Sequence, residues 1–249
     1  MKYHLFLFVA AAMAGAIYGS SGVVQAQALK AHAYVMPSGL MDYWKFDDNG
    51  GPTAIDCVGG YNASLNPGDS WTMGIIKGAV HFNGSSTSYV SVPSGIMGTT
   101  SDFTICTWVK VDANAMWNRI FDFGSGTNSY MFLSPYSGDN TVRFAITTSG
   151  NNDEERIDST APLTVGIWHH VAVTVSQTVG ILYIDGIEVG QNNNMTLKPS
   201  SLGRTTQDYI GKSQWAADPT LSGAIDDFRI YNRALRSSEI VALARLTGE

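Results

Sequence analysis

Residues 166–190, Gly-Ile-Trp-His-His-Val-Ala-Val-Thr-Val-Ser-Gln-Thr-Val-Gly-Ile-Leu-Tyr-Ile-Asp-Gly-Ile-Glu-Val-Gly, decide the fold class of this chain. Val171, Val173 and Val175 alternate with small or polar residues, and a period of two places all three valines on one face of a strand. Residues 177–180 interrupt the pattern, and Asp185-Gly186 is a pair favoured in two-residue hairpin turns. The stretch predicts three consecutive antiparallel strands whose valine face is buried against a second sheet.

Short apolar segments bounded by Gly, Asn, Asp, Ser or Pro recur along the rest of the chain. We expect further strands at residues 40–46, 79–82, 89–92, 103–111, 120–123, 130–133, 142–147, 209–211 and 223–231. No helical pattern separates these strands, so a parallel α/β sheet is excluded. The spacing predicts an all-β sandwich of two antiparallel sheets.

Helical periodicity occurs only in the tail, at residues 238–246. Ile240 and Leu243 fall on one face, and Glu239 lies in the first turn, where the helix dipole favours an acid. Ser237 is the predicted N-cap. We therefore expect one short C-terminal helix after the last strand.

The N-terminal residues have the features of an export signal. Lys2 precedes an apolar run from Leu5 to about Tyr18, and small residues typical of a cleavage site follow at 24–28. The run is shorter than the ~20 apolar residues that span a bilayer, so membrane insertion is not expected. We predict a signal peptide at 1–26, a flexible leader at 27–38 and one domain at 39–249, in a protein that is secreted, extracellular or periplasmic.

The charge of the chain argues against some partners. The 249 residues carry a formal net charge of −6, and loss of Lys2 with the signal would make it −7. A negative protein is an unsuitable partner for nucleic acid or an anionic membrane, and divalent cations suit it better. The ~220 residues that remain are enough for one large β domain, which we expect to be a monomer.

The chain contains two cysteines, Cys57 and Cys106. In an oxidising compartment a disulfide between them is the default expectation. The alternative is two separate thiols, because Cys106 lies in an apolar strand and could be a core residue.

Nine short motifs resemble, in order, those of laminin G-like or concanavalin A-like jelly-roll domains. They are residues 40–46 with 56–60, 81–84 with 89–93, 103–109, 168–174, 182–186, 210–211 and 225–235. The resemblance covers about residues 39–246 and implies a two-sheet jelly roll. It implies little about activity, because this fold hosts lectins, adhesion modules and glycosidases alike.

The glutamates do not form the pair that a retaining glucanase needs, two carboxylates ~5 Å apart on one strand face. They occupy loops, a hairpin and the tail, at positions 154, 155, 188, 239 and 249. His169 and His170 are adjacent in a strand, so they point to opposite faces and cannot share a site. A binding protein is therefore favoured over an enzyme, with a glycan hydrolase or lyase as the less favoured alternative.

Acidic residues near the first and last strands suggest a cation site. In this fold these strands are expected to lie side by side, and calcium takes 6 to 8 oxygen ligands from carboxylates and carbonyls. By resemblance, Asp226 matches a structural calcium ligand of related jelly rolls. The candidate ligands are Asp47, Asp56, Asn62 and Asp226. Alternatively, these are solvated turn residues with no ion.

Aromatic residues in or beside loops are candidates for sugar recognition, which combines an aromatic platform with polar neighbours. The candidates are Trp117, Tyr130, Tyr136 and Trp215, with Asp122 and Arg143 as hydrogen-bonding partners. The alternative for each aromatic residue is a place in the core. The sequence predicts a secreted lectin-like module that binds carbohydrate, with a structural calcium ion; the second interpretation is an extracellular protein-interaction or adhesion module.

Overall fold

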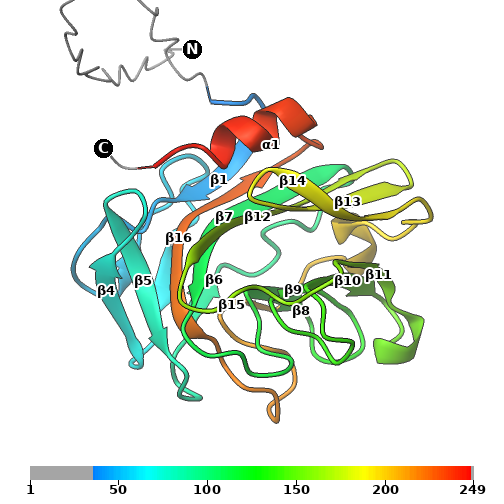
Figure 1. Ribbon diagram of the computed structural model, residues 1–249. Coiled ribbons are helices and arrows are strands. Elements are labelled where there is room, and N and C mark those ends of the chain that lie inside the picture. Colours follow the sequence, from blue (N-terminus) through cyan, green and yellow to red (C-terminus); the bar gives the residue numbers. More distant parts are fainter. Residues whose placement is uncertain (1–35, 248–249) are drawn as a thin grey trace, which may run out of the picture. The chain divides into compact units, whose positions relative to one another are not determined.

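The computed structural model describes residues 36–247, and residues 38–247 lie in one compact unit. The described residues contain sixteen strands in two eight-stranded antiparallel sheets, and the sheets stack face to face (Figure 1). The all-β jelly-roll prediction is confirmed. The predicted signal peptide and most of the predicted leader lie outside the described residues. Within 36–247, no helix has the length and apolar character needed to cross a bilayer.

The first sheet contains the strands from which the fold was predicted. Its order is β14-β13-β12-β7-β16-β5-β4, and β1 also pairs with β16. The bounds are β1 Leu40–Trp44, β4 Asp69–Met73, β5 Gly78–Asn83, β7 Phe103–Val111, β12 Trp168–Ser176, β13 Val179–Ile184, β14 Ile187–Asn192 and β16 Ser222–Tyr231. Asp185 and Gly186 have φ of 53° and 80°, as the predicted hairpin turn requires. The first and last strands lie side by side, as expected.

The second sheet has the order β11-β10-β9-β8-β15-β6-β3-β2. The bounds are β2 Thr53–Ala54, β3 Ala63–Leu65, β6 Val90–Val92, β8 Phe121–Gly124, β9 Tyr130–Ser134, β10 Arg143–Thr147, β11 Glu155–Asp158 and β15 Gln207–Ile210. Two 3₁₀ helices, Asn151–Asp153 and Pro199–Leu202, belong to connecting segments. The short strands β2 and β3 and the edge strand β11 were not predicted. Each is too short or too polar to show an alternation of apolar and polar residues.

The core lies between the two sheets. Val171, Val173 and Val175 are fully buried, and the ring of Phe228 meets that of Phe121 edge-on at 6.0 Å. Phe228 comes from the first sheet and Phe121 from the second, so this contact crosses the sandwich. Burying a large apolar side chain contributes about 1.5–3 kcal/mol, and this core holds the sheets at a fixed register.

The C-terminal helix α1 spans Ser237–Leu243 and buries Ile240 and Leu243, as predicted. Its N-cap is Arg236 and not Ser237. The Glu239 carboxylate accepts the backbone N–H of Arg236 at 2.8 Å and pairs with Arg233 at 2.7 Å. The acid in the first turn therefore stabilises the start of this helix by direct hydrogen bonds.

The predicted disulfide is wrong: Cys57 and Cys106 are both free thiols. Cys106 is enclosed within β7, opposite Ala172 on one side and Arg229 on the other, whereas Cys57 lies in an exposed turn. Burial raises the pKa of the Cys106 thiol to about 12. That thiol is unreactive at neutral pH, because only the thiolate is a nucleophile.

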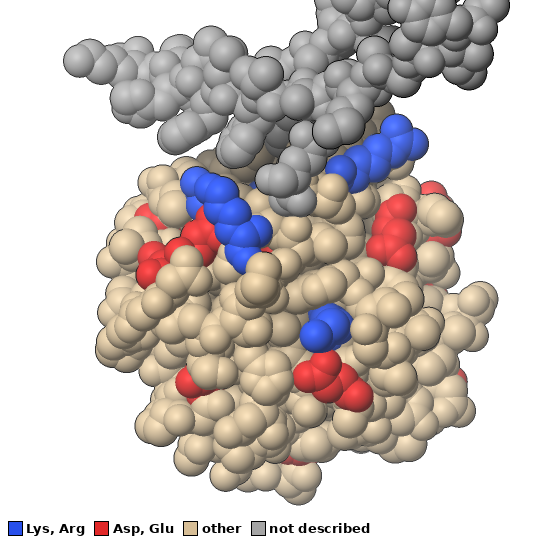
Figure 2. Space-filling view, turned by 60° about the vertical axis from the view of Figure 1, so that its left-hand side comes forward, with Lys and Arg blue, Asp and Glu red and all other residues tan. Residues whose placement is uncertain are grey.

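The two adjacent histidines occupy different environments. His170 is fully buried, and burial lowers its pKa to about 3, so it is neutral at physiological pH. His169 pairs with Asp185 through a 2.7 Å contact at the hairpin turn. Figure 2 shows one face of the molecule, where charged side chains are few and occur with both signs.

Candidate functional site

The face of the second sheet that points away from the core carries a row of side chains in register. Strand pairing aligns Asp122 of β8 with Phe132 of β9, Phe132 with Ala145 of β10, and Ala145 with Arg156 of β11. Their neighbours along each strand face the core, because successive side chains alternate. This row is the floor on which the candidate site is built.

A cleft of about 530 Å³ opens over this floor. Two tryptophans from loops far apart in the sequence line this cleft: Trp117 precedes β8, and Trp215 lies between β15 and β16. The cleft is lined by Trp117, Arg119, Phe132, Arg143, Asn151, Asn152, Glu154, Arg156, Trp215 and Asp218. Aromatic rings and polar groups thus converge in one concave site, which is typical of small-molecule and glycan pockets.

Trp117 is held in a strained backbone conformation, with φ of 69°. Its N–H donates to the carbonyl of Tyr136 at 2.8 Å, and its carbonyl accepts from the Arg119 guanidinium. The ring lies 5.7 Å and 5.5 Å from the guanidinium carbons of Arg119 and Arg143. A left-handed backbone at a bulky residue costs about 1–3 kcal/mol and clusters at functional sites. The surrounding contacts therefore fix the ring before any ligand arrives.

Trp215 rests on a buried tyrosine. Its ring meets that of Tyr130 edge-on at 4.8 Å, and the Tyr130 hydroxyl donates to Glu154 at 2.6 Å. Tyr130 has no exposed surface, so it supports the cleft without lining it. Burial raises the pKa of Glu154 above its ordinary value, and the Tyr130 hydroxyl opposes this rise.

Asp122 lies beneath the cleft with no exposed surface. Its carboxylate accepts from Arg119 at 3.3 Å and from the Gln214 N–H at 3.1 Å. Burial raises its pKa to about 7, and the Arg119 charge opposes this rise. Arg119 also donates to Asp218 at 3.1 Å. This network closes Asp122 to ligands and ties the loop that carries Trp215 to β8.

The other two arginines are also engaged. Arg143 donates to Asp158 at 2.7 Å and pairs with Asp139, while Arg156 contacts the same two acids at 3.4 Å each. The three cleft arginines therefore pair with four carboxylates, those of Asp122, Asp139, Asp158 and Asp218. No arginine at the cleft has an uncompensated charge, so the site offers polar hydrogen bonding without an excess of positive charge.

The six ligand-binding residues predicted from sequence all lie at or next to this cleft. Trp117, Arg143 and Trp215 line it, whereas Asp122 and Tyr130 lie beneath. Tyr136 stands behind Trp117, and its hydroxyl donates to Asn140 at 3.0 Å. Seven further lining residues were not predicted from the sequence: Arg119, Phe132, Asn151, Asn152, Glu154, Arg156 and Asp218. Only the tertiary fold brings these residues together, because Phe132 and Arg156 come from β9 and β11 and the others from loops. Arg119 could have been suggested by its position two residues after Trp117.

Two of the predicted calcium ligands lie near one another. Asp226 accepts the N–H of Ile76 at 2.8 Å, and Asp47 accepts that of Gly78 at 2.8 Å. Oδ1 of Asp226 is buried with no partner among the described residues. Burial and the charges of Asp227 and Asp47 raise the pKa of Asp226 to about 8. An added methyl group at Gly78 would lie 2.6 Å from the carbonyl oxygen of Phe46, so this main-chain oxygen lies beside the glycine whose N–H Asp47 accepts.

The other two predicted ligands belong to a separate turn. Asn62 accepts the N–H of Asp56 at 3.0 Å, and Asp56 accepts the N–H groups of Tyr43, Val58 and Tyr61 at 2.9–3.0 Å. Within residues 36–247, no three acidic, histidine or cysteine side chains are grouped as metal ligands. Asp56 and Asn62 are therefore held within their own turn, and the calcium site remains a prediction. The donors of its own turn already occupy the Asp56 carboxylate.

Asp42 is an ionisable residue next to Asp56, with 1% of its surface exposed and Oδ2 unpartnered among the described atoms. An added methyl group at Gly59 would lie 2.8 Å from Oδ2 of Asp56 and would also strike the Asp42 carboxylate. Burial and the Asp56 charge raise the pKa of Asp42 to about 7. Backbone donors keep Asp56 ionised against the effect of its burial, with its pKa below the ordinary value.

Asp42→Asn is expected to stabilise the protein at pH 8 and to change little at pH 4. A carboxyl whose pKa is raised on folding disfavours the folded state when ionised, so the loss develops from about pH 4 and is complete above about pH 7. Relaxation of the turn around Asp42 reduces the cost of ionising its carboxyl in the folded state. We therefore expect Asp42→Asn to raise the free energy of unfolding at pH 8 by an amount on the order of 2 kcal/mol. Urea unfolding at both pH values measures it, with Asp48→Asn in the same region as control. An equal effect at both pH values would contradict the shifted pKa.

A family model described as the concanavalin A-like lectin/glucanases superfamily matches residues 83–241. Human neuronal pentraxin-2 is 30% identical over 153 residues, which are 57% of this chain and 33% of the pentraxin. The chain thus spans about a third of the length of the curated relatives it matches.

Solved structures share the architecture. Domain 4 of AbnA, a GH43 extracellular arabinanase from Geobacillus stearothermophilus in complex with arabinotriose, aligns with a TM-score of 0.70 and 22% identity, over 83% of this chain and 98% of that domain. Trypanosoma rangeli sialidase aligns with a TM-score of 0.65 and 19% identity, over 85% of this chain and 34% of the sialidase. At these identities the likeness shows the fold alone. With the matched family model, the chain belongs to the concanavalin A-like lectin/glucanases superfamily.

Proposed function

We propose that this protein is a secreted, non-catalytic module that binds carbohydrate in the cleft between Trp117 and Trp215, stabilised by one calcium ion. The observation that carries the proposal is the pair of tryptophans at one cleft whose arginines all form ion pairs with carboxylates of the protein. Sugars present an apolar face of C–H groups and a rim of hydroxyls, and an aromatic ring with adjacent polar groups complements both.

The polar groups of the cleft suit an uncharged ligand. Each arginine at the site is compensated by a carboxylate, so an acidic sugar would have to compete with carboxylates of the protein itself. Asn151, Asn152 and Glu154 offer both donors and acceptors to hydroxyl groups. The arabinotriose bound by the arabinanase domain of the same fold supports an oligosaccharide ligand.

A glycan array probed with the purified protein, with and without a chelator, tests this proposal. We expect binding to uncharged oligosaccharides, and weaker binding to their uronic acid counterparts. Incubation of the strongest ligand with protein, followed by assay for new reducing ends, tests for catalysis. Release of reducing ends would favour a hydrolase that uses Glu154, and the absence of any array signal would reject the carbohydrate proposal.

The second candidate function is recognition of an extracellular protein. Ile55, Val58 and Tyr61 are 51%, 49% and 54% exposed on one turn, next to the free thiol of Cys57. Neighbouring exposed apolar side chains are a common feature of protein-binding surfaces. Loss of binding to a partner protein on Tyr61→Ser, with glycan binding unchanged, would favour this function.

The calcium ion would be held by the carboxylates of Asp47 and Asp226 with carbonyl oxygens such as that of Phe46. These are the hard oxygen ligands that calcium prefers, and Oδ1 of Asp226 is free among the described residues to coordinate it. The ion would replace the proton that Asp226 otherwise retains up to about pH 8. Its role would be structural, joining β16 to the segment that follows β1.

Addition of calcium to chelator-treated protein is expected to raise the free energy of unfolding by about 2.7 kcal/mol at a concentration ~100 times the dissociation constant. Asp226→Asn should remove this gain, because it removes the charged ligand without changing the core. Asp42→Asn is the matched control, since that buried acid lies in β1 beside Asp56 and is not a proposed ligand. A melting temperature that does not respond to calcium in the wild-type protein would show that the site binds no ion.

A further inference from the structure

The outward row of side chains does not end at the cleft. Beyond Asp122 it continues through Tyr209 of β15 and Ser91 of β6 to Ser64 of β3, each paired with the next. Tyr89 precedes β6 and points to the same side, because Val90 faces the core. The face that carries the cleft therefore has a second aromatic pair, on the opposite side of Asp122 from Phe132.

This second pair is half-buried and carries a cation. The rings of Tyr89 and Tyr209 meet edge-on at 5.2 Å. The Lys212 ammonium lies 3.9 Å from the Tyr89 ring centre and 4.9 Å from that of Tyr209. Lys212 forms no ion pair with an acid among the described residues, so the rings hold its position. This cluster combines two aromatic rings with polar groups, namely the hydroxyls of Tyr89 and Tyr209 and the ammonium of Lys212.

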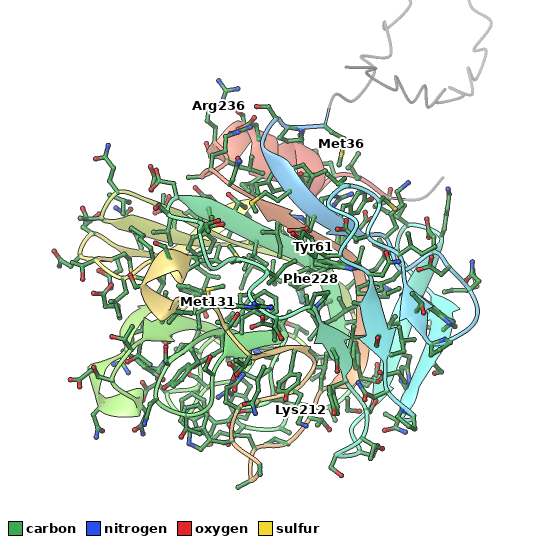
Figure 3. The ribbon with its side chains drawn as sticks, turned by 180° about the vertical axis from the view of Figure 1, so that it is seen from behind. Met36, Tyr61, Met131, Lys212, Phe228 and Arg236 are labelled. Carbon is green, nitrogen blue, oxygen red and sulfur yellow. The ribbon has the colours of Figure 1, made fainter. Side chains whose placement is uncertain are left out.

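One loop connects the cleft to the Tyr89–Tyr209 pair. Lys212 and Trp215 both belong to the segment after β15, and between them the Gln214 N–H donates to Asp122 at 3.1 Å. The loop thus crosses β8 with Trp215 on one side and Lys212 on the other. Figure 3 shows Lys212 on the far side of the second sheet from Phe228 of the first sheet. Both places face solvent on the same side of the molecule.

The spacing of the two places exceeds one sugar ring. Tyr209 and Phe132 are two strands apart, which corresponds to about 10 Å across the sheet. We propose that Tyr89, Tyr209 and Lys212 form a second subsite, and that the protein binds a chain of several sugars across β9, β8 and β15. This inference rests on the proposed function of the cleft. Linked contacts of one ligand add affinity without a second association cost.

Calorimetric titration with arabinan-, xylan- and β-glucan-derived oligosaccharides of one to six units tests the inference. For the series that binds, affinity is expected to rise at least about tenfold once the chain reaches beyond the cleft. Tyr209→Ala and, separately, Lys212→Ala should lower the affinity for the longest chains towards that of the short ones. Tyr61→Ala, an exposed tyrosine on another turn, is the control and should keep the full length dependence.

The possible failures are distinct. If no oligosaccharide of any length binds, the proposed function fails, and the second subsite with it. If short and long chains bind equally, or if both Tyr209→Ala and Lys212→Ala keep the length dependence in folded protein, the second subsite is wrong and the cleft alone binds the glycan. Circular dichroism and the melting temperature show that each variant is folded.

Discussion

Replacement of Trp117 by alanine is expected to weaken glycan binding at least about thirtyfold, which corresponds to about 2 kcal/mol. Trp117 forms one wall of the cleft, and its ring is fixed between the guanidinium groups of Arg119 and Arg143 before the ligand arrives. A prepositioned aromatic ring contributes affinity without the cost of ordering that side chain on binding. Calorimetric titration with the strongest array ligand measures the loss.

The fold should survive this change. Trp117 is only partly buried and lies in a loop, and alanine keeps the same Cβ atom, so the substitution adds no backbone strain at φ 69°. Trp168→Ala is the matched control, since Trp168 is also half-buried but belongs to β12 in the other sheet. An unchanged dissociation constant for Trp117→Ala in folded protein would move the binding site away from this cleft.

Arg119→Leu is expected to destabilise the protein by about 3–5 kcal/mol, because it leaves the carboxylate of Asp122 buried without its cationic partner. For a domain of this size the loss corresponds to a fall of about 10 °C in melting temperature. The effect should be larger at pH 8 than at pH 5. Burial already raises the pKa of Asp122 to about 7, so protonation relieves the unpaired charge at the lower pH.

The second substitution Asp122→Asn separates the charge effect from lost packing. The double variant Arg119→Leu/Asp122→Asn should recover a large part of the stability at pH 8, because no buried charge then remains at this position. Arg156→Leu is the control: its side chain is 51% exposed, and its ion pairs should be worth less than about 1 kcal/mol. A single variant as stable as the wild-type protein at both pH values would show that Asp122 does not need Arg119.

The fold could be predicted because its signals are local. Val171, Val173 and Val175 alternate within one strand, and Asp185-Gly186 specifies its turn by backbone geometry alone. The C-terminal helix could be predicted for the same reason, but its N-cap could not. The sequence is compatible with an N-cap at either Ser237 or Arg236. The N-cap is Arg236 because its backbone N–H donates to the Glu239 carboxylate.

The cleft could be predicted only in part. Trp117, Arg143 and Trp215 were suggested by residue type and loop position, but the same argument also selected Asp122, which the structure encloses. Glu154 was dismissed as a loop residue, and it lines the cleft. The disulfide failed for a related reason, because an even number of cysteines says nothing about their distance in the fold.

The sequence by itself determined that this chain forms a two-sheet jelly roll, because periodicity and turn preferences act between residues close together in the chain. Only the tertiary structure decided which residues share a site. Trp117 and Trp215 are nearly a hundred residues apart, and the calcium candidates Asp47 and Asp226 are further still. Their proximity depends on strand order and register, which are set by burial of the whole core and not by any local pattern.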